Sequence, residues 1–546
     1  MNESKEELQQ QVSQLLHQDI VQIATFYGEN NYVSLPLTTT FIQDIMLLKT
    51  YDVKYVHNNE LNEIIGILQE ELHFNTAVNL SIRTALDFLI GKEEDIKKAL
   101  YVYLFLRVSK EHFSDAFSIF SVMNATVKDL FSDFMQYIFN NSFLTLDESI
   151  QIDCLYKAWN LSLQVFQDNE ASQFAYGELK KLFHTALVYE KTEVAFWLYY
   201  TPLHYFNSGT HSNKHEANER FKQEIEKPLE KYIEEKVIPK YNIQPNTRKP
   251  EKNKKKKVAF VMQRIIRHST VHVLFNLLKK VLSEKQDNYE FVLYDLAFPE
   301  SNGSDATYVE EFKLLGIEYV NLHEKIFGNS NQTYSLLEKC IKSREILIED
   351  KVDIFIGLHT RIEYIFFYGT RTAPQQFYWY HGSNEEYDIE GIDKRISHCG
   401  ISPTCSFEME SFFVLGDYKK SQETGLEQSA KEVRDCFPSD YTILGSVGRL
   451  IKIDNDKYLQ TVFQIMKKNP KTIYLACGDG DKSRIEEVVR KHSLEERFIF
   501  TGFVNPKVYG RVIDVYLNTF PDPGGESVNE FLSLDDNKYV VSLNKE

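Results

Sequence analysis

The pattern of apolar residues changes near residue 250, and this change constrains the fold more than any other feature of the chain. Before it, apolar side chains recur at steps of three and four residues, as in Ile96, Leu100 and Leu104, which is the spacing of one face of a helix. After it, short apolar runs alternate with amphipathic stretches. We therefore expect residues 1–245 to form an α-helical domain, irregular or built from degenerate repeats, and the remainder to form α/β domains.

The residues after the change contain two successive series of strand-like runs. The first series begins at Val258–Val261 and the second at Thr442–Gly445, and helical stretches separate the runs. Strands and helices that alternate in this way predict parallel sheets covered by helices on both faces. We expect two Rossmann-like domains, over residues 258–416 and 417–546, with the carboxyl ends of their strands on either side of one cleft.

Residues 246–257 join the helical part to the first sheet and are polar and basic. The run TRKPEKNKKKK includes Pro250 and leads directly into a strand. Proline and a block of like charges are typical of a solvated linker. A nuclear-localisation or lipid-binding role for the lysines is the less favoured alternative.

Charge and cysteine usage exclude several classes of function. The formal net charge of -17 argues against nucleic-acid binding, because that affinity depends on Lys and Arg neutralising phosphates. The polar residues 1–11 lack the apolar core of a signal peptide, and no uncharged apolar run is long enough to span a bilayer. Six scattered cysteines indicate reduced thiols. We expect a cytoplasmic protein with no membrane span and no metal.

Two loops that follow strands of the second series predict a diphosphate site. Gly445–Lys452 offers glycines, which permit close backbone approach, and the cations Arg449 and Lys452. Phe520–Ser527 opens a helix, whose unpaired amides can bind phosphate oxygens. Glu530 lies one turn into that helix, where its carboxylate could accept hydrogen bonds from ribose hydroxyls. An ordinary strand-turn-helix with a solvated glutamate fits this second segment equally well.

A histidine follows the first strand of the first sheet. His268 lies on a loop that we expect to face the cleft, where it could orient a phosphate or take a proton as a general base. A loop histidine more often forms only structural hydrogen bonds. His272 lies one turn along the following helix, and we expect it to be structural.

Five segments in the second half of the chain resemble, in order, those of glycosyltransferase family 41, which includes the protein O-GlcNAc transferases and the bacterial cytoplasmic N-glucosyltransferases. They are KVAFVMQRIIRHSTVHVL (257–274), RTAPQQ (371–376), LIKID (450–454), NPK (505–507) and the segment from NTFP to the glutamate (518–530). The resemblance implies a GT-B fold, meaning two facing Rossmann-like domains, and a UDP-sugar donor substrate without a cofactor.

The resemblance also implies roles for individual residues. Lys452 would contact the diphosphate, a loop at 505–507 would lie beside the uracil, and Glu530 would bind the ribose. The expected donor-binding residues are Arg449, Lys452, Asn505, Lys507, Gly524, Gly525, Glu526, Ser527 and Glu530, and the candidate catalytic residue is His268.

The chain departs from the family at two of these places. Gly525–Ser527 stands where the O-GlcNAc transferases have a His-Thr-Thr run, and Arg449 replaces a glutamine. Gly448 followed by Arg449 resembles the retaining glycosyltransferase family 4 instead. The donor sugar and the stereochemical outcome therefore stay open.

We expect a glycosyltransferase that moves a hexose or N-acetylhexosamine from a UDP-sugar to Ser/Thr or Asn side chains. The helical domain would dock the protein acceptor, for which an adhesin or other surface protein is a candidate. The alternatives are a family 4-like enzyme acting on a glycan or lipid carrier, and a non-catalytic GT-B binding or chaperone-like subunit. The sequence stops soon after Val541, so we expect the second Rossmann-like domain to be truncated or completed by a partner glycosyltransferase subunit.

Overall fold

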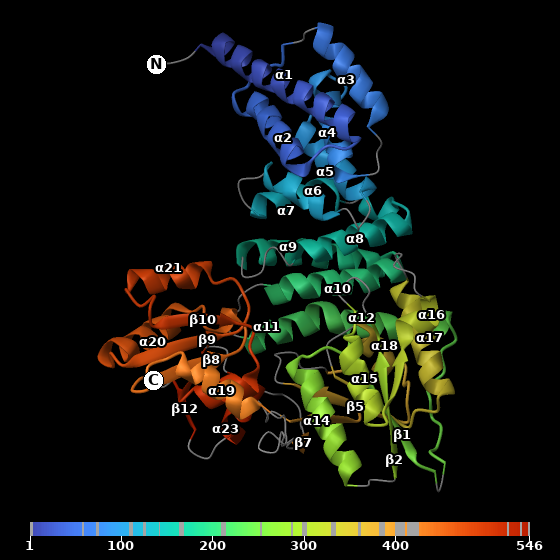
Figure 1. The fold of residues 1–546 in the computed structure, drawn as a ribbon. Coiled ribbons are helices and arrows are strands. Elements are labelled where there is room, and N and C mark those ends of the chain that lie inside the picture. The colour runs from blue at the N-terminus through green and yellow to red at the C-terminus, as the bar shows by residue number, and fades with distance from the viewer. Residues whose placement is uncertain are drawn as a thin grey trace.

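The structure is a computed structural model, in which the chain forms a helical part followed by a seven-stranded and a five-stranded sheet (Figure 1). The described residues are 4–56, 59–72, 76–108, 113–123, 127–140, 142–162, 169–208, 214–251, 254–284, 288–297, 303–328, 335–358, 362–381, 388–398, 410–411, 425–520, 524–534 and 538–543. None of the described helices combines the length and the apolarity that crossing a membrane requires. The predicted fold class, a helical domain followed by two Rossmann-like sheets, is confirmed.

The helical part contains thirteen α-helices within the described residues. They are α1 (Lys5–Asn30), α2 (Leu35–Thr50), α3 (Asn59–Glu71), α4 (Ala77–Leu89), α5 (Ile96–Arg107), α6 (Phe113–Ser121), α7 (Val127–Tyr137), α8 (Glu148–Ser162), α9 (Asn169–Val188), α10 (Thr192–Ser208), α11 (Lys214–Phe221), α12 (Lys227–Tyr232) and α13 (Ile238–Lys240), with short helices η2 (Phe143–Thr145), η4 (Lys222–Glu226) and η5 (Ile233–Val237) between them.

Side chains in the sequence set where several of these helices begin. Ser4 and Glu7 form a capping box at α1, in which each side chain accepts a hydrogen bond from the other residue's backbone N–H. Asp95 accepts hydrogen bonds from two backbone N–H groups at the start of α5. Ile96, Leu100 and Leu104, whose spacing predicts one helix face, are at most 1% exposed, so that face forms part of the core.

The first sheet is parallel, with strand order β3-β2-β1-β4-β5-β6-β7. Its strands are β1 (Lys256–Met262), β2 (Tyr289–Asp295), β3 (Glu318–Asn321), β4 (Ile354–Gly357), β5 (Gln375–Tyr380), β6 (Lys394–Ser397) and β7 (Glu410–Ser411), and its helices are α14 (Ser269–Ser283), α15 (Ala306–Leu314), α16 (Leu322–Phe327), α17 (Leu336–Glu349) and α18 (Ile362–Gly369). Val258 pairs with Phe291 on one side and with Ile354 on the other. The apolar runs of β1, β2 and β4 are therefore adjacent in space, as the sequence predicts.

The second sheet is also parallel, with strand order β10-β9-β8-β11-β12. Its strands are β8 (Thr442–Val447), β9 (Thr472–Cys477), β10 (Phe498–Gly502), β11 (Val515–Asn518) and β12 (Tyr539–Ser542), and its helices are α19 (Leu426–Asp435), η6 (Leu450–Lys452), α20 (Asp456–Lys468), α21 (Ser483–Lys491), α22 (Pro506–Val512) and α23 (Glu526–Leu534). Strand β8 contains the predicted run Thr442–Gly445. Helix α19 precedes the first strand of this sheet, and its Leu426 and Ala430 belong to a core of the second sheet.

One continuous apolar core joins the helical part to one face of the first sheet. It includes Phe196 of α10, Phe366 of α18 and Val261 of β1, and α10 packs against α17 and α18 (Figure 1). The opposite face of that sheet has a separate core, which contains Phe260. The two cores of the second sheet contain no residue before Leu426 among those the structure describes.

A buried carboxylate reinforces the joint between the helical part and the first sheet. Glu193 of α10 is 6% exposed and accepts hydrogen bonds at the start of α17 from the backbone N–H groups of Leu336 (2.6 Å) and Leu337 (3.1 Å) and from Ser335 Oγ (2.7 Å). The Trp197 indole donates to the same carboxylate (3.1 Å). A carboxylate from one domain thus caps a helix of the next, where the helix dipole favours negative charge.

The prediction of a solvated linker over residues 246–257 is wrong for part of that range. Asn246 is hydrogen-bonded to the first sheet domain. Its backbone N–H donates to Arg371 O (2.8 Å), and its Nδ2 donates to Thr372 O (2.8 Å). The strand β1 already begins at Lys256. The partners of Asn246 lie more than a hundred residues away in sequence, so no local pattern could indicate them.

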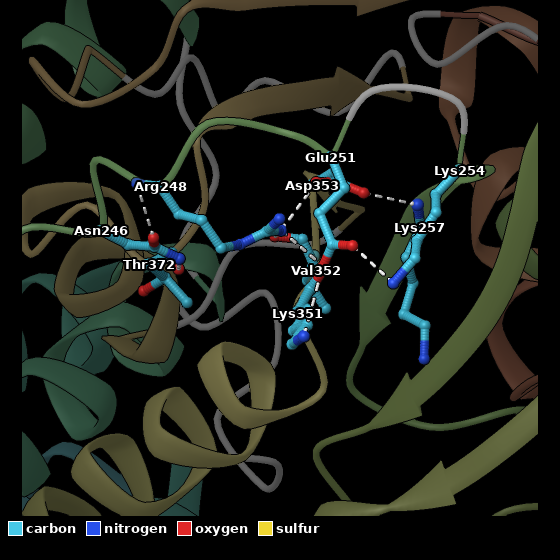
Figure 2. Close-up of polar contacts among 9 residues, drawn as sticks. All are labelled: Asn246, Arg248, Glu251, Lys254, Lys257, Lys351, Val352, Asp353 and Thr372. Atoms are coloured by element: carbon cyan, nitrogen blue, oxygen red, sulfur yellow. Dashed lines mark hydrogen bonds and ion pairs between the residues drawn. The ribbon is translucent and has the colours of Figure 1, made fainter.

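Arg248 fixes the same segment to the end of α17 and the start of β4 (Figure 2). Its Nη2 donates to Asp353 Oδ1 (2.7 Å) and to Lys351 O (2.7 Å), and Asp353 Oδ2 accepts from the backbone N–H of Lys257 (2.9 Å). Figure 2 also shows exposed Glu251 between Lys254 and Lys351. The charges in this segment are therefore partly neutralised by contacts within the protein.

Candidate functional site

A small pocket lies at the carboxyl ends of β8, β9 and β11. It is lined by Ser446, Val447, Gly448, Arg449, Leu450, Lys452, Ile453, Ala476, Cys477 and Thr519. The chain order reverses between β8 and β11, and ligands of open parallel sheets bind outside the carboxyl ends of the strands at such a point. The two predicted cations, Arg449 and Lys452, are thus at the place where this fold class binds its ligands.

The glycines of the first predicted loop pack differently from what the sequence suggests. Gly445 lies inside β8, where an added Cβ would meet Ile513 Cδ1 at 2.7 Å. Gly448 does lie in the loop, but the close approach there is to a second loop. A Cβ on Gly478 would meet Gly448 O at 1.8 Å. The glycines therefore let two protein loops touch, and this contact shapes the pocket.

The turn η6 holds the two cations beside these glycines. Leu450 N donates to Asp479 O (3.0 Å), and Lys452 N donates to Arg449 O (3.0 Å). Arg449 is exposed, whereas Lys452 is half-buried and its Cδ would lie 3.8 Å from a Cβ on Gly448. The stem of Lys452 thus packs over the glycine loop at the edge of the pocket.

The start of α23 supplies fewer amides than the sequence predicts. The N–H of Gly524 donates to Asn518 Oδ1 (2.8 Å), so a diphosphate would have to displace Asn518 to use this amide. Gly525 is exposed, and Glu526 begins the helix, its side chain lying outside the described residues. The amide of Ser527 remains at the first turn. Sequence reasoning missed Asn518, although an asparagine that ends a strand six residues before a glycine is a typical turn-forming residue.

A buried tyrosine connects the two loops of the pocket. The Tyr516 hydroxyl donates to Val447 O (3.0 Å) and accepts from Val447 N (3.2 Å), and it lies 3.1 Å from Ser527 Oγ. Val447 ends β8 and Ser527 lies in the first turn of α23. Tyr516 therefore fixes the position of Ser527 relative to the glycine loop, and only the folded sheet brings these three residues together.

Glu530 of α23 lies against a residue of the first sheet. Its Oε1 is 3.7 Å from Nε2 of His272 on α14, and the Nδ1 of His272 is 3.4 Å from the Tyr308 hydroxyl. The Glu530 side chain is 20% exposed. His272, expected to be only structural, thus contacts the carboxylate that the sequence assigns to the ribose, and it does so across the joint between the sheets.

His268 occupies the N-cap position of α14, at the carboxyl end of β1. Its pKa is lowered from 6.5, first by partial desolvation and then by the positive charges of Arg449, Arg264 and Lys452. Arg449 and Lys452 belong to the second sheet, so the carboxyl ends of both sheets face each other here. The lowered pKa keeps the imidazole neutral at pH 7, the form that can accept a proton.

The other residues predicted to bind the donor substrate, Asn505 and Lys507, lie at the end of β10. Asn505 caps α22, and its Oδ1 accepts from Lys507 N (2.9 Å). Lys507 O in turn accepts from Arg511 Nη1 (2.7 Å). Both residues follow β10, two strands away from β8, and neither lines the pocket. The Asn505 side chain therefore has a capping function that the sequence prediction did not include.

The RTAPQQ segment forms a structural turn between α18 and β5. Gln376 is buried, and its side chain accepts from Thr372 N (2.8 Å) and donates to Gly391 O (2.7 Å). Arg371 pairs with Asp393 (2.8 Å).

Within the described ranges, no group of three or more His, Cys, Asp and Glu side chains is arranged to hold a metal ion.

The chain is similar to several solved glycosyltransferase structures, whereas no protein-family model and no curated protein matches it. An O-GlcNAc transferase of Thermobaculum terrenum is 12% identical, with a TM-score of 0.45 over 94% of this chain and 83% of that chain. A glycosyltransferase of Rickettsia africae is 14% identical, with a TM-score of 0.37 over 53% and 79%. HepE of Anabaena, solved in complex with UDP, is 13% identical, with a TM-score of 0.36 over 53% and 86%. The two strand orders of the chain itself are those of two Rossmann-like sheets, the architecture of the GT-B fold.

Proposed function

We propose that the chain is a UDP-sugar-dependent glycosyltransferase related to family 41, and that it acts on protein side chains in the cytoplasm. One observation carries this proposal: Arg449 and Lys452 line a pocket at the strand-order reversal of the second sheet, and both act on His268 of the first sheet domain. A base on the first sheet domain and cations on the second would suit in-line transfer from a nucleotide diphosphate sugar.

The donor diphosphate would bind between Arg449, Lys452 and the first turn of α23. Glu530 would accept hydrogen bonds from the ribose, for which it has to exchange its contact with His272. In the reaction, the bond from the anomeric carbon to the diphosphate oxygen breaks and a bond to the acceptor oxygen or nitrogen forms. The acceptor proton passes to His268, and the negative charge that develops on UDP is stabilised by Arg449 and Lys452.

The helical part would dock the protein acceptor, and its rigid attachment supports this role. The apolar core it shares with the first sheet and the cap that Glu193 provides to α17 hold it in a fixed position relative to His268. A docked protein would therefore present its side chain at a defined place in the cleft. Donor binding would need no residue of the helical part.

A thermal-shift screen against UDP, GDP and their sugars, followed by an assay of UDP release, tests the donor assignment. A ligand that binds the folded chain raises its unfolding temperature by an amount that grows with the ratio of ligand concentration to Kd, so UDP and one UDP-sugar should stabilise the chain and GDP should not. His268→Asn should keep that stabilisation and lose UDP release. If no nucleotide stabilises the chain, the site does not bind a donor and the non-catalytic alternative is favoured.

A family 4-like enzyme acting on a glycan is the second candidate, because Arg449 follows a glycine at the point of strand-order reversal. The two candidates differ in their acceptor. Intact proteins should be modified better than free sugars or short peptides if the helical part docks a protein. Equal modification of free sugars would favour the glycan-directed enzyme.

A further inference from the structure

A second cavity, remote from the pocket at β8, lies between the end of the helical part and the first sheet domain. Its volume is about 440 Å³, within the range of roughly 300 to 1,000 Å³ that is usual for small-molecule sites. Its walls include Ile243, Gln244, Ile341, Arg344, Ile348 and Phe366. Other lining residues are polar, but the apolar side chains of Ile341, Ile348 and Phe366 line the cavity together with one cation, Arg344.

That cation is buried, and no described carboxylate forms an ion pair with it. Arg344 is 7% exposed, and no carboxylate among the described residues lies within ion-pair distance of its guanidinium. Its Nε donates to Thr370 Oγ1 (3.1 Å), and its Nη2 donates to Gln244 O (2.5 Å) and Thr370 O (3.1 Å). The two N–H groups of Nη1 form no hydrogen bond to a described residue. Arg344 therefore has a positive charge and two donors left for a partner.

A buried charge without a counter-charge is costly, and proteins normally pair such groups. The nearest acidic side chain in the cavity wall is Glu345, which pairs with Lys342 at 3.3 Å and is about half exposed. Solvent screens the charge of Glu345 and an opposite charge already faces it. It attracts the guanidinium only from a distance, and the desolvation of Arg344 outweighs that attraction and lowers the pKa of Arg344. Nη1 presents two N–H donors, and oxyanions accept such donors in strong charge-assisted hydrogen bonds.

We propose that this cavity binds a small amphipathic anion, in which a carboxylate or phosphate group pairs with Arg344 and an apolar body contacts Ile341, Ile348 and Phe366. The site is separate from the donor pocket and does not depend on the function proposed above. Its ligand would also contact residues 241–247, which connect the helical part to the first sheet. Binding should therefore stabilise the joint between these two parts.

Isothermal titration of the full chain with benzoate and with phenyl phosphate tests the site, with benzamide as the uncharged control probe. We expect saturable binding of at least one anion and none of benzamide. The stronger of the two anions identifies whether the natural group is a carboxylate or a phosphate. Failure of both anions to saturate, or equal binding of benzamide, would overturn the proposal.

Two variants locate the binding. Ile348→Phe fills the cavity without altering Arg344, and Arg344→Lys keeps the charge but removes the paired donors. Each substitution should weaken the binding of the anion about tenfold or more, while UDP binding stays unchanged. Lys313→Gln, on α15 and outside the cavity, should bind the anion as the wild type does. If Ile348→Phe binds the anion with wild-type affinity, the anion binds elsewhere and the proposal is wrong, even if Arg344→Lys is too unstable to measure.

Discussion

The joint between the helical part and the first sheet and the joint between the two sheets differ in polarity. Between the helical part and the first sheet, an apolar core is continuous and a buried carboxylate, Glu193, caps α17. Between the two sheets, the facing groups are His268, Arg449 and Lys452, with His272 against Glu530. An apolar joint fixes two parts as one body, whereas a joint lined by polar and charged groups leaves them available to a ligand. We expect chemistry at the second joint and rigidity at the first.

The substitution with the largest expected effect on this comparison is Glu193→Ala. It leaves two backbone N–H groups and an indole N–H buried without their acceptor, and the stability of the first joint should fall by about 3 kcal/mol or more. All three tryptophans, Trp159, Trp197 and Trp379, lie in the helical part or the first sheet, so urea unfolding followed by tryptophan fluorescence reports on this body alone.

The matched control is Glu235→Ala, an exposed glutamate whose side chain is 57% accessible and 3.7 Å from Lys231. It should change stability by less than about 1 kcal/mol. If Glu193→Ala costs no more than this control, the cap does not hold the joint and the contrast between the joints is lost.

The second test, Lys452→Ala, addresses the joint between the sheets. Loss of a charge-assisted contact to phosphate should weaken UDP binding by about 1.5 to 3 kcal/mol, measured by calorimetry, without moving the tryptophan transition. Lys457→Ala, an exposed lysine on α20, is the control. Unchanged UDP affinity in Lys452→Ala would remove Lys452 from the donor site.

A smaller effect is expected for Tyr516→Phe. The change removes one hydroxyl that bridges Val447 and Ser527, and UDP binding should weaken by about 1 kcal/mol. The backbone amide of Val447 should also exchange its hydrogen faster, because it loses its acceptor. Tyr539→Phe, at an exposed tyrosine on β12, should do neither. Normal exchange at Val447 in Tyr516→Phe would show that the hydroxyl does not connect the loops.

The smallest effect concerns the pKa of His268. Because this pKa is lowered from 6.5, the imidazole should gain its proton only below that pH, and transfer should fall on acidification only there. Arg449→Gln removes a nearby positive charge, so the pKa should rise and the titration of His268, followed by NMR, should move to higher pH. His268→Asn identifies the resonance. A titration that does not move would place Arg449 too far away to act on His268.

The sequence predicted the elements better than the contacts between them. The runs at Val258–Val261 and Thr442–Gly445 are strands because a buried parallel strand is a local apolar pattern. The segment containing Asn246 was predicted to be solvated because its partners, Arg371 and Thr372, are remote in the sequence. In the same way, the use of the Gly524 amide by Asn518 depends on a turn geometry that residue types alone do not specify. The placement of His268 opposite Arg449 followed from topology, which the alternation of strands and helices does reveal.

The cap that Glu193 forms on α17 also has a consequence for synthesis on the ribosome. Glu193 precedes its partner Leu336 by 143 residues, and chains grow at about 5 to 20 residues per second. For roughly 7 to 30 seconds, the nascent helical part therefore exists without the helices that cover the apolar face of α10. During this interval that face is available to a chaperone or to another nascent chain, so the yield of folded protein should depend on the rate of translation between residues 193 and 336.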